Sequence, residues 1–596
     1  MSEKKLRAIV LFGILLLIGA VITVLRDPGA NQYEISVYSA YPGYFWAFVI
    51  GSILIGSLVV IASARSPNDK SWMFGLTLVL LTNMLLLSIP YIRGYQMIGR
   101  ADAMSHVGFS QDVVLLGSIN SNIYPPMHVV IAALGDATGV QLVTLGLAVP
   151  LVFSGLYFAG MFYLLVFLFD SRERILFSLP FVMLPILGRV HVGLRPFDLS
   201  IMLIPLVLYL FFRSQNVPTP AVRGAFVVVL LGILLYHPLT ALLIIGVFVI
   251  YFAGRYAPGI KKEYAAPTSF VSVSIAVFAA WYSNFTGIIL RFVRVFERLF
   301  GGGEEGAAPV EGYTSAAEQA SPPLIDLLRV LTFSYGVEII LFGLGFLFIG
   351  AVLWLLVREK LPLEVHTLMF VGTLVVFTAG SVIFLFLDLI VPHDRPLQIA
   401  KISAVVLAGQ LFYLLWIHLD WSQYQPKTRT ALHVSIVLLV TVLVALTILS
   451  IYPSPLSASS NSQVTEMEMD GNEWLTQHGD ASDEVTEFGI SYRRFYHAQH
   501  GVQPGVPFLH YPVPNHFNYT NHDNLGQSYG NDTYMTLTTR GRIVYPEVFP
   551  NYPENWRFTP EEFDRLEQDH STERIYDNGD YNQYLIEGMA DEEVEQ

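Results

Sequence analysis

Long apolar stretches alternate with short polar connections over residues 1–452 of the chain. Thirteen stretches have the composition of membrane helices, and several reach the length of about 18 residues that crosses a bilayer. They cover residues 8–25, 44–64, 71–91, 140–169, 175–188, 199–212, 224–236, 239–254, 267–286, 335–357, 363–389, 398–418 and 430–451. No small-residue cleavage site follows the first stretch, so it is interpreted as a span rather than a signal peptide. The pattern predicts an all-α, polytopic membrane domain.

Residues 224–254 allow two interpretations, one long helix or a hairpin of two helices. A break at His237-Pro238 gives proline the first turn of a helix, a position that it favours. The break also keeps Lys261 and Lys262 on the side where the other basic connections lie. We therefore predict a hairpin, although its two halves are short for full spans.

Basic residues orient the predicted spans. Lys4, Lys5 and Arg7 precede the first span, and the positive-inside rule places them in the cytoplasm. Six later clusters then fall on the same side: Arg65 with Lys70, Arg172 with Arg174, Arg213 with Arg223, Arg255 with Lys261 and Lys262, Arg358 with Lys360, and Lys427 with Arg429. This topology makes residues 92–139 and 287–334 external loops and places residues 453–596 outside the cell.

Charge separates the two parts of the chain. Residues 453–596 contain 25 acidic residues, 7 arginines and no lysine, a net charge of −18, whereas the rest carries +4. An acidic domain without lysine is a poor partner for nucleic acid, and strong negative charge is typical of proteins from salt-loving organisms. We therefore expect a halophilic, archaeal source. The chain has no cysteine, which excludes disulfides and thiolate metal sites.

Local patterns predict a small α/β fold for the acidic C-terminal domain. Helices are expected at 467–478 and 560–568, and strands at 484–490, 541–545 and 583–587. Asn518-Tyr519-Thr520 and Asn531-Asp532-Thr533 match the N-glycosylation pattern. In the second external loop, residues 288–300 predict an amphipathic interfacial helix. The glycine-rich run Gly301–Gly306 after it predicts a flexible connection.

Polar residues of the membrane region gather on the predicted outer side. Ionisable groups at membrane depth are costly and are usually paired or functional. An outward-facing pocket is therefore expected from these side chains: Asp102, His106, Asp112, Tyr124 and His128 of the first external loop, His191, Arg195 and Asp198 between the fifth and sixth spans, His237 at the hairpin tip, and His393, Asp394, Arg395 and Lys401 between the eleventh and twelfth spans.

The order and sidedness of these motifs resemble the GT-C superfamily of integral membrane glycosyltransferases. The matching features are Asp102 with His106, the run Tyr124-Pro125-Pro126-Met127, and the run His393-Asp394-Arg395-Pro396. The runs Tyr33–Tyr38 and Tyr236–Leu239 are similar to archaeal members. The resemblance implies many spans, a first external loop that begins with an acidic residue, a soluble C-terminal domain, and sugar donors carried on polyprenyl phosphates.

The chain departs from the oligosaccharyltransferases of this superfamily, which resemble metal enzymes with paired acids. Arg100 precedes Asp102 with no second acid nearby, and no Trp-Trp-Asp signature occurs. We therefore expect no metal or other cofactor, and the transfer of one sugar rather than a whole glycan. Histidine metal ligands are the less favoured interpretation.

Glycosyl transfer assigns a role to several of these residues. Asp102 would take the proton from an acceptor hydroxyl, which is worth roughly 10²–10⁴ in rate. His106, four residues later, would either orient this carboxylate or contact the acceptor. Arg395, and then Arg195 and Lys401, would bind the phosphate of the leaving lipid. The expected activity is that of an inverting hexosyltransferase, with dolichyl-phosphate mannose as donor and a glycan or glycoprotein of the surface layer as acceptor.

Two other functions remain open at this stage. A lipid-linked-sugar flippase or transporter would place its charges near the midplane, on repeated halves, a symmetry not visible in the sequence. A surface-assembly protein would use the spans only as an anchor, for which one helix suffices. The sequence leaves the sugar, the protein-linked or lipid-linked nature of the acceptor, and the oligomeric state open.

Overall fold

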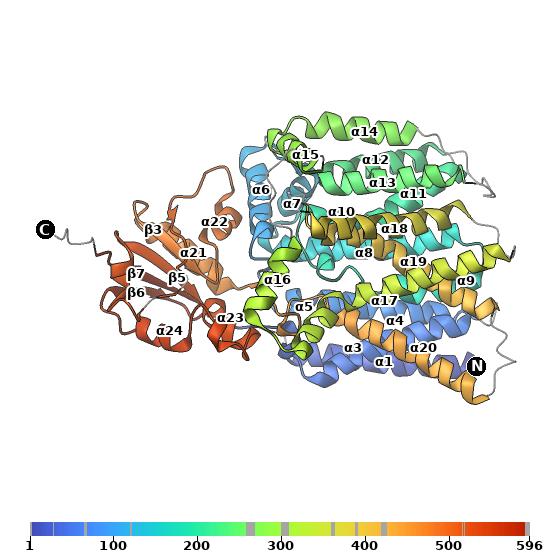
Figure 1. Ribbon diagram of the computed structural model, residues 1–596, viewed down its shortest axis with the longest axis horizontal. Coiled ribbons are helices and arrows are strands. Elements are labelled where there is room, and N and C mark those ends of the chain that lie inside the picture. Colours follow the sequence, from blue (N-terminus) through green and yellow to red (C-terminus); the bar gives the residue numbers. More distant parts are fainter. Residues whose placement is uncertain are drawn as a thin grey trace.

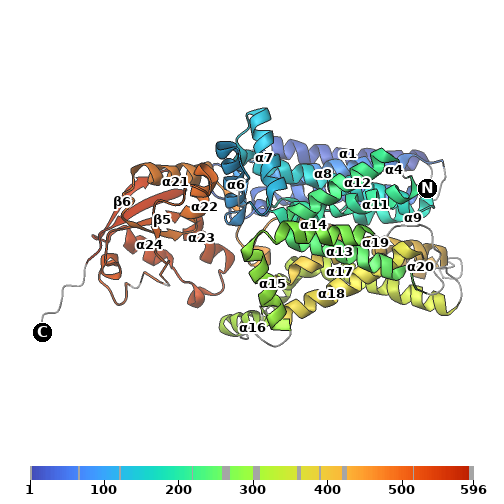
Figure 2. The ribbon, with the colours of Figure 1, turned by 90° about the horizontal axis from the view of Figure 1, so that it is seen from above.

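The computed structural model describes residues 3–27, 29–64, 68–119, 122–217, 219–257, 269–299, 309–358, 364–387, 391–418, 426–514, 516–517 and 519–589. Some residues used in the sequence predictions lie outside these described ranges: Arg65, Lys261, Lys262, Gly301–Gly306, Lys360 and Asn518. A bundle of long helices forms one part of the molecule, and a sheet domain caps one end of it (Figures 1 and 2). The N-terminus lies at the opposite end of the bundle.

Each of the thirteen predicted spans contains helix. The helices of the bundle are α1 (Glu3–Arg26), α3 (Gly43–Ser63), α4 (Ser71–Leu87), α5 (Ile89–Ile92), α8 (Leu142–Leu168), α9 (Arg172–Val182), α10 (Pro196–Met202), α11 (Ile204–Asn216), α12 (Pro220–Tyr236), α13 (Pro238–Gly254), α14 (Ser269–Tyr282), α17 (Leu324–Val357), α18 (Val365–Phe386), α19 (Asp394–His418) and α20 (Pro426–Leu449). The fold class is thus confirmed.

The described residues include six helices long and apolar enough to cross a membrane, or up to eight if each bent pair is one span. Helices α10 and α11 form one such pair, with a bend of 40°, and α14 with α15 (Thr286–Leu299) forms the other, with a bend of 117°. The chain is therefore a multi-pass membrane protein. The number of thirteen crossings and the side that faces the cytoplasm stay predictions.

The hairpin predicted at His237-Pro238 is confirmed. Helix α12 ends at Tyr236 and α13 begins at Pro238, and the two run side by side. His237 between them has extended backbone, φ −159°, and its side chain accepts a hydrogen bond from the Leu239 N–H. This bond satisfies one of the N–H groups that a helix start leaves unpaired.

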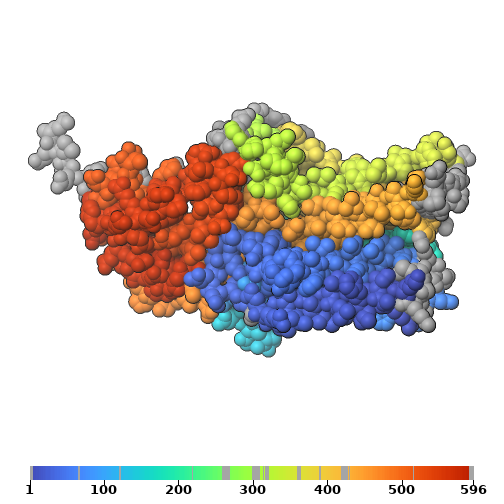
Figure 3. All heavy atoms as spheres, turned by 90° about the horizontal axis from the view of Figure 1, so that it is seen from below, coloured from blue at the N-terminus to red at the C-terminus, as the bar shows by residue number. Residues whose placement is uncertain are grey.

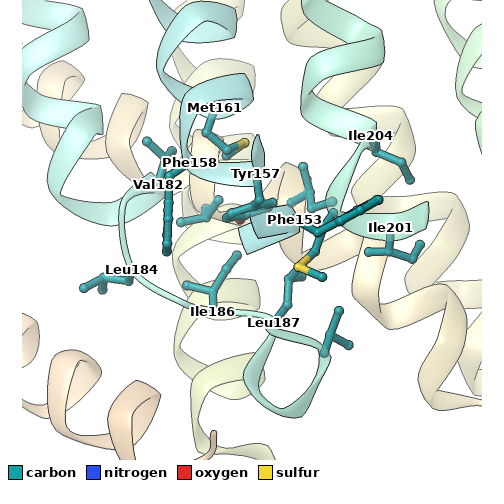
Figure 4. Close-up of a cluster of buried hydrophobic side chains, with 14 of the residues drawn as sticks. Phe153, Tyr157, Phe158, Met161, Val182, Leu184, Ile186, Leu187, Ile201 and Ile204 are labelled. Carbon is teal, nitrogen blue, oxygen red and sulfur yellow. The ribbon is translucent and has the colours of Figure 1, made fainter. Parts of the chain in front are cut away.

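Close packing at small residues holds the N-terminal helices together. A Cβ on Gly56 of α3 would lie 2.6 Å from the carbonyl oxygen of Gly75 on α4, and the converse is also true. Small residues at such crossings let two backbones approach closely, which is how helices associate in a bilayer. Figure 4 shows a second packed region, where Phe153, Tyr157 and Phe158 of α8 meet Leu187 and Ile201.

The C-terminal domain is a five-stranded mixed sheet with helices, so the predicted α/β class is confirmed. The strand order is β4-β3-β5-β7-β6, with β3 parallel to β4 and β5, and β7 antiparallel to β5 and β6. The strands are β3 (Glu484–Phe488), β4 (Leu509–His510), β5 (Thr533–Thr538), β6 (Thr572–Asp577) and β7 (Tyr581–Ile586). The helices are α21 (Glu466–His478), α22 (Tyr492–His500), α23 (Thr539–Val548) and α24 (Pro560–Leu566).

The strand predicted at 541–545 is wrong, because these residues lie in α23. The Thr538 side chain accepts a hydrogen bond from the Gly541 N–H and so starts a helix there. The neighbouring strand β5 lies just before it. The helices predicted at 467–478 and 560–568 and the strands at 484–490 and 583–587 are confirmed. Glycosylation at Asn518 and Asn531 stays a prediction.

Among the described residues, the connections contain five shorter α-helices and a small ribbon. The helices are α2 (Val37–Ala40), α6 (Asp102–Leu116), α7 (Pro125–Thr138), α15 (Thr286–Leu299) and α16 (Pro309–Ala320), and the ribbon is β1 (Met97–Ile98) paired antiparallel to β2 (Gln463–Val464). Helices α6 and α7 lie across the end of the bundle that faces the C-terminal domain (Figures 1 and 2). The amphipathic helix predicted at 288–300 is present as α15, and its apolar Phe292 and Phe296 are exposed.

Candidate active site

The predicted base, Asp102, is the first residue of α6. Its side chain is 66% exposed, and its carboxylate oxygen Oδ1 accepts a hydrogen bond from Nη2 of Arg494 at 2.9 Å. A carboxylate in the first turn of a helix also interacts favourably with the helix dipole. Arg494 belongs to α22 of the C-terminal domain. The predicted base is therefore reachable by a substrate and is held by a guanidinium from the other end of the chain.

Helix α22 docks along α6 through several further contacts. Nη1 of Arg494 donates to Oγ of Ser105 at 2.9 Å, and the same hydroxyl lies 2.8 Å from Nδ1 of His497. A Cβ on Gly108 would lie 2.3 Å from the carbonyl oxygen of His497, so only glycine permits this approach. Asp112 accepts the Val502 N–H at 3.0 Å. The C-terminal domain is thus part of the wall around Asp102.

A buried ion pair anchors the residues just before Asp102. The Arg100 guanidinium donates two hydrogen bonds of 2.6 Å to the Glu468 carboxylate, which is completely buried. Arg100 also donates to the Gly489 carbonyl at 2.7 Å. Buried charges are tolerated only when they are paired and hydrogen-bonded, as both are here. The start of α6 is therefore tied to α21 as well as to α22.

His106, the predicted companion of Asp102, lies one turn further along α6 and is buried. Its Nδ1 lies 3.1 Å from Nε2 of His128, and Nδ1 of His128 lies 2.8 Å from Oδ1 of Asn122. An amide oxygen can only accept, so His128 carries its proton on Nδ1 and accepts from His106 Nδ1–H. Nε2 of neutral His106 is then a proton acceptor. The hydrogen bond of His106 therefore goes to His128, whereas Asp102 is held by Arg494.

The pKa of His106 is lowered to about 4, mainly by burial; the charge of Asp102 opposes this shift, and Arg195 and Arg494 add to it. The ring is therefore neutral at ordinary pH. A neutral His106 can accept a hydrogen bond from a substrate hydroxyl, which its protonated form could not do.

A row of contacting rings leads from His106 to Arg395. Tyr124 lies edge-on to His106 at 5.9 Å and stacks on His237 at 5.5 Å between ring centroids. Nη1 of Arg395, near the start of α19, lies 3.3 Å from Nε2 of His237. The guanidinium also lies over the Phe197 ring at 4.9 Å, a cation–π distance. The structure thus brings together four of the predicted site residues from four separate segments.

His237 and Arg395 present two N–H donors to the same space. Nδ1 of His237 accepts the Leu239 N–H at 3.2 Å, so the neutral ring carries its proton on Nε2, beside Arg395. Burial, and then the charge of Arg395, lower the pKa of His237 to about 3. Two donors that cannot bond each other both need an acceptor, and an anion between them would satisfy both.

Arg195 and Asp394 border this group. Arg195 forms a two-pronged pair with the buried Asp198, at 2.7 and 3.1 Å. Asp198, and then Asp394 and Asp102, raise the pKa of Arg195 through their charges. The guanidinium keeps about half of its surface exposed. Arg195 is therefore largely neutralised by Asp198, and it stays a secondary candidate for binding phosphate.

The remaining predicted residues have other partners. Nζ of Lys401 is buried and donates to Glu338 of α17 at 2.9 Å, so its charge already joins two helices. His191 is fully buried and bonds the Ser154 hydroxyl at 3.0 Å. The His393 carbonyl accepts from Ser381. These contacts favour structural roles for the three residues, and their roles in a site stay predictions.

Sequence reasoning missed three residues around this site: Arg494, Asn122 and Arg291. It placed His128 among the outer polar residues but gave it no role. Arg291 of α15 acts on Tyr124 and His237 through its charge. Its position on an amphipathic helix next to the membrane could have suggested it. No sequence signal connects Arg494 to Asp102. Among the described residues, no group of three or more His, Asp or Glu side chains is placed to hold a metal ion.

Comparison with known proteins finds similarity only at the level of structure. No family model and no curated protein sequence matches the chain. An oligosaccharyltransferase from Archaeoglobus fulgidus, tethered with an acceptor peptide, is similar over 81% of this chain and 72% of its own, with 11% identity and a TM-score of 0.46.

Two further solved structures are similar to the chain. The arabinofuranosyltransferase AftD from Mycobacteria matches 87% of this chain, with 12% identity and a TM-score of 0.46, and this chain covers 42% of its length. ArnT from Cupriavidus metallidurans, bound to undecaprenyl phosphate, matches 86% of this chain and 98% of its own, with 11% identity and a TM-score of 0.43. All three TM-scores are below 0.5, so the activity of this chain is argued from its own residues.

Proposed function

We propose that the chain is a membrane glycosyltransferase that moves one sugar from a polyprenyl-phosphate donor to a glycan acceptor. The observation that carries the proposal is the combination of an exposed carboxylate, Asp102, with a pair of N–H donors at His237 and Arg395. Both lie at the end of the bundle that faces the C-terminal domain, joined by the contacting rings of His106 and Tyr124.

On the acceptor side, Asp102 is the proposed general base. An acceptor hydroxyl attacks the anomeric carbon of the donor sugar and gives its proton to the Asp102 carboxylate. Arg494 holds this carboxylate in position, and Nε2 of His106 is available to accept a hydrogen bond from the acceptor. Proton removal of this kind is worth roughly 10²–10⁴ in rate.

On the donor side, the bond between the anomeric carbon and the phosphate oxygen breaks as the new bond forms. The lipid phosphate leaves with additional negative charge, which Arg395 and the Nε2–H of His237 are placed to stabilise. Fixed donors are effective here because they need no reorganisation during the reaction. The proposed chemistry uses side chains alone and predicts no metal requirement.

A single displacement of this kind inverts the anomeric configuration. We propose a hexose, and mannose on dolichyl phosphate in particular, as the sugar transferred, following the sequence resemblance. The proposed acceptor is a surface-layer glycan on the outer face of the membrane. The predicted topology supports this side, because it places the C-terminal domain and the loop of Asp102 outside.

The test is the transfer of labelled mannose from dolichyl phosphate in membranes that carry Asp102→Asn. We expect the rate to fall by about 10²–10⁴, the contribution of a general base. Asp136→Asn is the matched control, because Asp136 is an exposed carboxylate of the same loop and should leave the rate unchanged. Full activity in the Asp102→Asn membranes would refute the proposal.

A further inference from the structure

A pocket of about 380 Å³ lies where α17 meets the C-terminal domain. Asp326 and Arg329 of α17 line one side, and four aromatic side chains of the C-terminal domain line the other: Tyr545, Phe549, Tyr552 and Trp556. Figure 3 shows the C-terminal domain, in red, packed against the yellow-green segment that includes the start of α17. None of these residues belongs to the site around Asp102.

Hydrogen bonds hold two of the four aromatic rings of the pocket in place. Nε1 of Trp556 donates to the Phe549 carbonyl at 2.9 Å, and the Tyr552 hydroxyl donates to Oδ2 of Asp326 at 2.8 Å. All four rings are partly exposed. Rigid rings lose little entropy on binding, so they favour affinity. The electron-rich faces of such rings suit the C–H groups that line one face of a sugar ring.

The charges of the pocket favour a neutral ligand with hydroxyl groups. Nη2 of Arg329 lies 3.4 Å from Oδ1 of Asp326, so the one cation among the described residues that line the pocket is already paired. Within the described lining, a phosphate would therefore meet a carboxylate and a cation that is already paired. Asn551 and Asn555 add amide groups that both donate and accept, as hydroxyl groups do. The volume falls within the range of small-molecule pockets, about 300–1,000 Å³.

We propose that this pocket is a carbohydrate-binding subsite, and that it holds a neutral sugar unit of the acceptor glycan. The role as an acceptor subsite rests on the proposed function, whereas sugar binding itself does not. The elements that line the pocket, α23 and the start of α17, lie at the same end of the bundle as α6 (Figures 1 and 2). The acceptor class is then an extended glycan that contacts both the bundle and the C-terminal domain.

Saturation-transfer NMR on the full chain tests sugar binding directly. The protein is placed in phosphatidylcholine nanodiscs, because sugar-headed detergents would compete, and is titrated with methyl α-mannoside and with N-acetylglucosamine. We expect saturable transfer to at least one of the two sugars. Binding should weaken at least tenfold in Trp556→Ala and Tyr545→Ala. Trp474→Phe is the control, because Trp474 stacks on Tyr576 at 4.7 Å outside the pocket and should bind normally.

Three outcomes would overturn the subsite: no transfer to either sugar, unchanged transfer in Trp556→Ala, or loss of the signal when phosphatidylglycerol is added, which would indicate a lipid headgroup. The Asp102→Asn variant separates the two proposals, because it should bind sugar normally. Sugar binding without any transferase activity in the unaltered chain would refute the proposed function and leave the subsite standing. A KM for the glycan acceptor that is unchanged in Trp556→Ala would refute the acceptor role.

Discussion

Replacement of Arg100 by methionine should loosen the C-terminal domain from the loop that carries Asp102. The change leaves the carboxylate of Glu468 completely buried, with the Thr465 N–H at 3.1 Å as a remaining hydrogen-bond donor. Removing one partner of a buried ion pair typically costs about 3–5 kcal/mol. Each 1.4 kcal/mol is a factor of ten, so the docking equilibrium should shift by roughly 10² to 10³·⁵.

Hydrogen exchange of the α21 amides measures this shift, because exchange reports the free energy of local opening. Arg100→Met should speed exchange by two to three orders of magnitude. Sugar transfer should also fall, by about 10²-fold if Asp102 moves by 1 Å. The double variant Arg100→Met with Glu468→Met leaves no buried charge without a partner, so it should be less destabilised than the single variant.

Arg574→Met is the matched control for a surface ion pair. Arg574 is 44% exposed and pairs with Glu567 and Asp577, so its removal should cost no more than about 1 kcal/mol. Exchange in Arg100→Met within about threefold of the unaltered chain would refute the reasoning. So would a double variant that is less stable than Arg100→Met.

Three further predictions concern the site itself. Arg395→Met should lower kcat by about 10²–10³, the effect of losing one donor to a developing anion, and an unchanged kcat with the lipid donor would contradict its role. The pKa of His106 is about 4 in the folded chain, below the ordinary 6.5, so the unfolded chain binds more protons between pH 4 and 6.5. Thermal stability should therefore fall as the pH decreases from 6.5 to 4. His106→Gln should make this fall in stability smaller. Gly108→Ala should destabilise the protein by about 1–3 kcal/mol, because its Cβ would meet the His497 carbonyl, whereas Gly155→Ala in α8, where nothing lies within 4 Å, should not.

Patterns within one segment predicted the fold well. Apolar length located helix in all thirteen predicted spans, and the proline after His237 located the break between α12 and α13. These features depend on the segment itself and on its contact with lipid. The strand predicted at 541–545 failed because its Ile-Val-Tyr composition suits either element, and the cap at Thr538 decides for a helix.

The candidate site was predictable only in part, because its residues come from distant segments. Asp102, Tyr124, His237 and Arg395 could be selected as polar residues on one side of the membrane. Arg494 could not be selected in this way. The acidic C-terminal domain suggested a solvated surface, and the few arginines of that domain formed no pattern. Its role depends on the docking of α22 against α6, which no local periodicity reports.

The antiparallel pairing of β1 with β2 has a consequence for the order of folding. Met97 and Ile98 follow the third predicted span, whereas their partners Val464 and Gln463 come after the last. During synthesis, β1 and the start of α6 therefore lack their partners, strand β2 and the Glu468 carboxylate, until nearly the whole membrane domain has been made. Domains generally fold as units in the order of their synthesis. We expect the end of the bundle that carries Asp102 to be the last part of this protein to become native, after every span is in the bilayer.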